Sequence, residues 1–145
     1  MAENSIEVRV GRLVEIRVSG YASAADVHAM LRRTKDRTAS MPTTLAVTAA
    51  DWRQCSVLAP DAAEEVVKML KGANAVTERS ALLYSDRSPT AVMQFMRLLA
   101  DARNPNRRMF SRAEQMAAWL SEVLNEEESL RLRTFLGLRP SAAIR

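Results

Sequence analysis

The feature that most constrains this chain is an alternation of short strand-like runs with amphipathic helical segments. Residues 6–10 and 13–18 each alternate apolar and polar side chains at period two, and a Gly-Arg pair separates them. This pattern is typical of half-buried strands joined as a β-hairpin. Two later runs, residues 45–47 and 80–84, are almost continuously apolar, as in strands that helices cover on a face. The sequence therefore predicts a sheet covered by helices.

Helix-starting residues and apolar spacing predict four helices after the hairpin. The helices are expected to begin at Ser23, Pro60, Ser88 and Ser111. Ser23 and Ser111 are each followed three residues later by an acidic residue, which indicates a capping box, and Ser88 precedes a proline suited to a first helical turn. A short last strand is predicted at residues 107–110. The order is β-β-α-β-α-β-α-β-α, which predicts an α/β fold whose mixed sheet has parallel crossovers.

The length of 145 residues and the hydrophobic fraction of 48% fit one domain with one core. We assign residues 1–128 to this domain and residues 129–145 to a C-terminal helical extension with a frayed tail. Three consecutive glutamates at 126–128 are expected to interrupt the helix that begins at Ser111. An apolar patch lies beyond them and contains Leu130, Leu132, Phe135 and Leu136. We expect this patch to pack back on the sheet or to form a homodimer contact, with self-association favoured.

Composition argues against several classes of protein. No apolar window approaches the roughly 20 residues of a membrane span, and the first residues lack the features of a signal peptide, so a cytoplasmic location is expected. One cysteine, Cys55, and one histidine, His28, do not suffice for an internal disulfide or a structural zinc site; no metal or cofactor is expected. The net charge of +4 is spread over all segments without a nucleic-acid-reading motif, so nucleic-acid binding is not favoured.

Several segments together resemble the STAS/SpoIIAA-like domains, the fold of the anti-sigma factor antagonists. They are a hairpin ending in residues 18–21, a helix opening at Ser23, an apolar strand followed by a long loop with Asp51 and Trp52, and a strand-turn-helix junction at residues 83–86. The resemblance covers about residues 6–124 and rests on element order and hydrophobic spacing. It implies a mixed β-sheet with helices packed on it.

The resemblance also implies a function. Members of this family are non-enzymatic binding modules that are switched by phosphorylation of a serine in an Asp-Ser-Ser-Gly-like turn between the third strand and the second helix. Ser56 is the nearest hydroxyl in this chain, but no acid precedes it and no glycine follows it. The chain therefore resembles a divergent SpoIIAA-like branch that keeps the fold without the switch. The implied role is a regulatory protein–protein interaction module in bacterial signalling, with a partner such as an anti-sigma kinase-like protein.

The candidate binding surface lies in two loops, residues 51–60 and 85–89, because open α/β sheets bind ligands at the carboxyl ends of their parallel strands. A large aromatic in a polar loop is either folded down on the core or presented as an interface anchor. A capped helix start beside an arginine offers N–H groups to an anion. The predicted partner-binding residues are Asp51, Trp52, Ser56, Arg87 and Ser88, and Ser56 is also a candidate phosphorylation site.

Two alternative functions would each require a specific structural feature. Nucleophilic catalysis needs a base within hydrogen-bonding reach of a hydroxyl or thiol. His28 lies beside the apolar stripe of the first predicted helix, whereas Cys55 and Ser56 are neighbours in a loop. This placement argues against such a site, so no catalytic residue is assigned and the chain is not expected to be an enzyme. A small-ligand or lipid-binding module on the same fold is the alternative, and it requires a cavity on the order of several hundred Å³.

Overall fold

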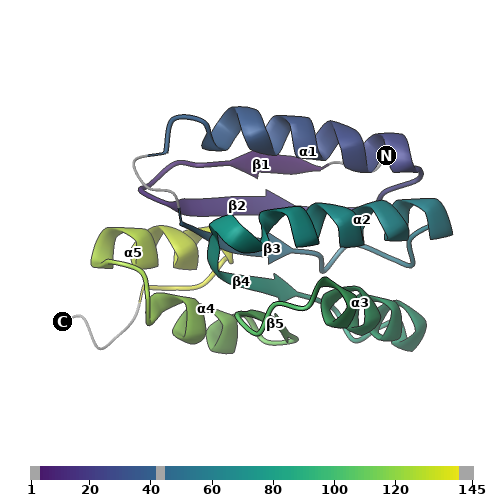
Figure 1. Ribbon diagram of the computed structural model, residues 1–145. Helices are drawn as coiled ribbons and strands as arrows, with labels where there is room; N and C mark the ends of the chain where they lie inside the picture. The colour runs from purple at the N-terminus through teal and green to yellow at the C-terminus, as the bar shows by residue number, and fades with distance from the viewer. Residues whose placement is uncertain (1–3, 42–44, 141–145) are drawn as a thin grey trace.

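A computed structural model describes residues 4–41 and 45–140. In these residues five strands form one sheet in the spatial order β1-β2-β3-β4-β5 (Figure 1). The strands are β1 (Ser5–Glu7), β2 (Leu13–Arg17), β3 (Ala46–Asp51), β4 (Thr77–Leu83) and β5 (Arg107–Phe110). The helices are α1 (Ala24–Thr38), α2 (Pro60–Ala73), the short 3-10 helix η1 (Asn74–Val76), α3 (Pro89–Ala102), α4 (Ala113–Ser121) and α5 (Glu126–Phe135).

The sheet is mixed, as the sequence predicts. The β1 and β2 strands form the antiparallel hairpin, with Ile6 opposite Ile16. All other neighbouring strands are parallel, and the last pair of the β2–β3 register brings Arg17 beside Asp51. The predicted α/β fold with parallel crossovers is therefore confirmed, and the fifth strand coincides with the predicted residues 107–110.

Helices cover both faces of the sheet (Figure 1). On one face, α1, α2 and α3 supply core residues such as Met30, Val66 and Phe95. On the other face, α4 and α5 supply residues such as Met116 and Leu132. Because side chains alternate along a strand, each central strand contributes to both cores. Within the described part of the chain, every helix is too short or too polar to cross a membrane.

The predicted helix starts are correct, but two of the predicted caps are wrong. Ser88 caps α3 as expected, since its Oγ accepts a hydrogen bond from the Ala91 N–H. Ser23 lies at the N-cap of α1 without a side-chain cap bond. The N-cap of α4 is Arg112 and also lacks such a bond. The acid of the second expected box, Glu114, pairs with Arg133 instead.

The glutamates expected to interrupt a helix in fact begin α5. Asn125 is its N-cap and forms a capping box with Glu128, and negative charge in the first turn is favourable at the positive end of the helix dipole. Leu132, Phe135 and Leu136 are buried on the sheet, which is one of the two outcomes expected for this patch.

The helix α5 spans the domain boundary predicted at residue 128 and belongs to the core on its face of the sheet. Leu130 alone of the four patch residues is exposed. The patch therefore gives no reason for a homodimer contact, and self-association stays a prediction. Most of the tail predicted to be frayed, residues 141–145, lies outside the described residues.

The β1–β2 turn and the start of α5 are in direct contact. Gly11 has a φ of 55°, which favours glycine, and a Cβ at this position would collide with the Glu128 carboxyl group. The same carboxylate accepts a hydrogen bond of 2.9 Å from the Arg12 N–H. The buried Glu128 thus ties the first hairpin to the last helix.

Candidate functional site

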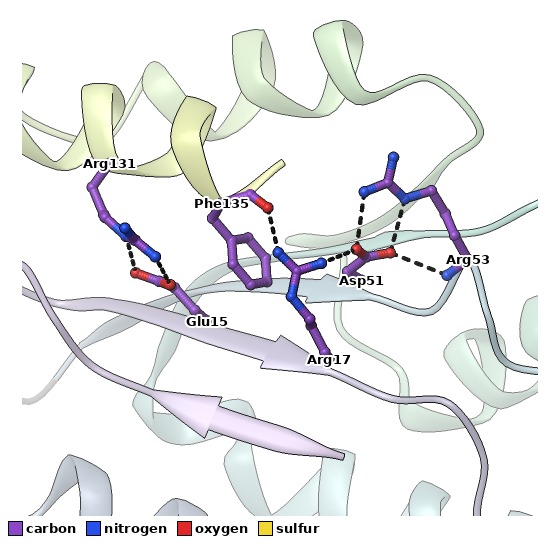
Figure 2. A network of polar contacts seen from close by, with 6 residues as sticks. All are labelled: Glu15, Arg17, Asp51, Arg53, Arg131 and Phe135. Atoms are coloured by element: carbon purple, nitrogen blue, oxygen red, sulfur yellow. Dashed lines mark hydrogen bonds and ion pairs between the residues drawn. The ribbon is translucent and has the colours of Figure 1, made fainter. Parts of the chain in front are cut away.

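A network of charged side chains lies at the carboxyl ends of β2 and β3 (Figure 2). Parallel pairing places Arg17 beside Asp51, and Arg17 Nη1 donates to Asp51 Oδ2 at 2.6 Å. Arg53 binds the same carboxylate through Nε and Nη2, both at 3.0 Å, and through its backbone N–H at 3.1 Å. One carboxylate therefore fixes two guanidinium groups.

Asp51 remains ionised in this network although it is only 7% exposed. Burial by itself would raise the pKa of Asp51, but the hydrogen bonds from Arg53 and the charges of Arg53 and Arg17 outweigh it and lower the pKa below its usual range. The hydrogen bond to Asp51 also raises the pKa of Arg53. Asp51 and Arg53 therefore remain charged at neutral pH.

The network extends from the sheet to α5. Arg17 Nη2 donates to the Phe135 carbonyl oxygen at 2.6 Å, and its guanidinium lies 4.3 Å from the centre of the Phe135 ring. One turn earlier on the helix, Arg131 donates two hydrogen bonds of 2.8 Å to the Glu15 carboxylate on β2. Figure 2 shows the two attachments side by side.

Arg17, Asp51 and Arg53 line an open polar groove of about 430 Å³, which we call the edge groove. Its remaining lining residues are Gln54, Tyr84, Ser85, Asp86, Arg87 and Ser111. Arg87 is exposed, and its Nε donates to Ser85 Oγ at 3.1 Å. Arg53 Nη1 has no hydrogen bond to any residue the structure describes and points away from Asp51. The edge groove thus offers N–H donors on arginine side chains already held in position.

The structure places the five predicted partner-binding residues in different environments. Asp51 and Arg87 line the edge groove, whereas Trp52, Ser56 and Ser88 do not. Trp52 is only 4% exposed. Its ring packs edge-on against those of Tyr21 and Phe95, with centroids 6.1 and 5.1 Å away. Of the two roles weighed for Trp52, folding down on the core is therefore the one its position supports.

Among the described residues, no hydrogen bond or ion pair joins His28 to Cys55 or Ser56. Burial raises the pKa of the Cys55 thiol to about 12, so little thiolate exists at neutral pH. His28 is half exposed and pairs with Glu65 at 3.0 Å, across the α1–α2 contact. Ser56 is exposed and stays a candidate phosphorylation site. Over residues 4–41 and 45–140, no three His, Cys, Asp or Glu side chains gather as metal ligands.

A second candidate site is a cavity of about 760 Å³ between the sheet and the helices α1, α2 and α3. Its floor on β3 consists of three short side chains, Ala46, Thr48 and Ala50, and β4 contributes Thr77, Ser80 and Leu82. Two of the residues that line it, Tyr21 and Arg107, each have a buried polar atom, the hydroxyl oxygen and Nε, without a hydrogen-bond partner among the described residues. The lining is otherwise mainly apolar.

Sequence reasoning identified Arg87 but missed Arg17 and Arg53 of the edge groove and Arg107 of the cavity. In the sequence, Arg17 occupies a polar position of an alternating strand, and Arg107 is one of several scattered basic residues. Arg53 follows Asp51 by two residues, a spacing that allows the local hydrogen bonds observed here. That spacing was the one available signal, because the other contacts join residues far apart in the chain.

Comparison with known proteins bears on the fold. No protein-family model matches the chain, and no curated protein matches it. A solved structure does match: an uncharacterized protein of the DUF3478 family from Shewanella loihica PV-4, described as having a SpoIIAA-like fold. It superposes with a TM-score of 0.63 at 15% sequence identity, covering 83% of this chain and 95% of that chain. The expected resemblance in fold is confirmed: this chain has a SpoIIAA-like fold.

Proposed function

We propose that the protein is a non-catalytic regulatory module that binds a protein partner through the edge groove. The observation that carries this proposal is the pair of guanidinium groups, on Arg17 and Arg53, that one buried carboxylate holds in place at the carboxyl edge of the sheet. This edge is where open α/β sheets bind their ligands. The resemblance noted in the sequence supports a role in bacterial signalling, in the cytoplasm, with an anti-sigma kinase-like protein as the partner class.

The chemistry of the edge groove favours an acidic segment of the partner. Asp51 is already occupied by Arg17 and Arg53, while Arg53 Nη1 and the exposed Arg87 remain available to carboxylates. A guanidinium group binds a carboxylate through parallel N–H donors. Because Asp51 holds Arg53 before binding, little side-chain entropy is lost when the partner docks.

Affinity measurements on two arginine variants test this proposal. A partner is captured from a bacterial lysate with the full chain, identified and purified, and its dissociation constant is then measured. Arg53→Gln is expected to weaken binding about tenfold or more, because each hydrogen bond to a charged group contributes about 1.5–3 kcal/mol. The matched control is Arg97→Gln, an exposed arginine on α3 outside the edge groove, and it should leave the dissociation constant unchanged.

The proposal also predicts that higher salt weakens the complex, since the contacts are between charges at an exposed surface. A partner whose affinity is the same for the unmodified protein, Arg53→Gln and Arg87→Gln would contradict the assignment of the edge groove.

A further inference from the structure

The cavity beneath α1 and α2 is large enough to hold a small molecule. Its volume of about 760 Å³ lies within the range of about 300–1,000 Å³ that is usual for ligand pockets. The floor follows β3 from Ala46 to Trp52, a span of about 20 Å at the usual rise of a strand. The space is therefore long enough for an extended molecule.

The hollow arises from the amino acids on the floor. A central strand flanked by helices normally carries large apolar side chains that fill the interior. Here β3 presents Ala46, Thr48 and Ala50 to the helices, and Ser80 follows on β4. Thr48 lies in the middle of the central strand and is nevertheless only partly buried. The short side chains therefore leave room that α1 and α2 do not fill.

A positive charge without a carboxylate partner lies in the wall of this cavity. Arg107 Nη2 donates to Asn74 Oδ1 at 2.8 Å and to the Leu70 carbonyl oxygen at 3.2 Å, and Nη1 lies 3.4 Å from Ser80 Oγ. These acceptors are all neutral, and Nε is buried without a partner among the described residues. Burial lowers the pKa of Arg107 to about 10, so the group is still charged at neutral pH.

A buried charge is stabilised by an opposite charge that forms hydrogen bonds with it. The rest of the lining is mainly aliphatic and includes Ile16, Met30, Leu82 and Leu99. From this combination we propose that the cavity binds a long-chain carboxylic acid, with its carboxylate at Arg107 and its hydrocarbon chain along the β3 floor toward Trp52. This inference is independent of the edge groove.

Fluorescence titration of the full chain, freed of bound lipid, tests the proposal. Trp52 lines the cavity, whereas the other tryptophan, Trp119, lies on the opposite face of the sheet, so the titration uses a Trp119→Phe background. Palmitate is expected to bind saturably, one molecule per chain, and at least tenfold more tightly than hexadecanol. The two probes share the chain length and differ in the charged group.

Three variants locate the binding site. Thr48→Leu fills the floor and is expected to weaken both probes at least tenfold. Arg107→Met is expected to abolish the preference for the acid while hexadecanol binding is kept. The matched control is Arg108→Met on the same strand, whose guanidinium lies over the Trp119 ring on the other face, and it should change neither affinity.

The comparison of palmitate with hexadecanol uses a protein whose cavity residues are unchanged. It therefore does not depend on whether a cavity variant folds. Absence of a saturable palmitate signal, equal affinity for the acid and the alcohol, or unchanged binding by a folded Thr48→Leu variant would each overturn the proposal. If the protein fails to bind palmitate but still binds its partner through the edge groove, this inference is refuted and the proposed function is not.

Discussion

Replacement of Arg131 by methionine is expected to destabilise the fold by about 2–3 kcal/mol. Glu15 lies in the middle of β2, and its side chain is 3% exposed. Its carboxylate accepts two hydrogen bonds of 2.8 Å from Arg131 on α5, while Arg9 approaches only to 4.0 Å. The methionine variant keeps most of the side-chain volume but leaves the buried carboxylate with the distant Arg9 as its ionic neighbour.

The magnitude follows from the burial of the two partners. Removing one member of a buried ion pair costs about 3–5 kcal/mol, because the other charge is left uncompensated. Here Arg131 is 28% exposed, so water replaces part of the lost contact and the cost falls below that range. The double variant with methionine at both Glu15 and Arg131 leaves no unpaired charge at this position. It should therefore be more stable than the sum of the single variants predicts, by about 1–2 kcal/mol.

Urea denaturation followed by circular dichroism at pH 7 measures these free energies, with an unchanged m-value as the check on two-state unfolding. Arg9→Met is the control, since Arg9 is 57% exposed and its loss should cost about 0.5 kcal/mol or less. A stability of Arg131→Met within about 0.5 kcal/mol of the unmodified protein, or strict additivity in the double variant, would refute the reasoning.

Two further predictions concern Asp51 and Tyr21. The pKa of Asp51 in the folded protein lies below its ordinary value of 3.8. The ionised carboxylate therefore contributes fully to the free energy of unfolding above pH 3.8, and this contribution is lost as the pH falls through the folded pKa. Asp51→Asn should thus cost about 2 kcal/mol at pH 7 and progressively less below 3.8 in a pH series of urea titrations; a pH-independent difference would contradict this. Tyr21→Phe removes a buried hydroxyl without a described partner and should raise the free energy of unfolding by about 1 kcal/mol. A clearly lower melting temperature for this variant would show that the hydroxyl is hydrogen-bonded.

The sequence was sufficient to predict most of the fold, because most of the elements carry a local signal. The alternation of the hairpin, the prolines at 60 and 89, and the strand at residues 107–110 each depend on neighbours in the chain. The start of α5 was missed although its cap is local. The three glutamates were interpreted as a polar interruption, whereas beside Asn125 they form the first turn of a helix.

The candidate sites were harder to predict because their geometry depends on distant pairs. Asp51 ends β3 and Arg87 follows β4, so the topology alone placed them at one edge. The role of Trp52 depended on whether Tyr21 and Phe95 would surround it, and both come from other elements. The cavity requires short side chains on β3 and an arginine on β5 under the same helices. No local pattern reports that juxtaposition.

The contact between Gly11 and Glu128 has a consequence for folding during synthesis. At about 5–20 residues per second, the ribosome needs roughly 6–25 s to proceed from the first hairpin to the start of α5. Until α5 is made, only α4 is available to cover the sheet face that Leu13, Val47 and Ala81 share with the two helices. Uncovered apolar surface of this kind is what chaperones bind, and we expect the exposure to end when the whole of α5 docks and its Glu128 carboxylate accepts the hydrogen bond from the Arg12 N–H.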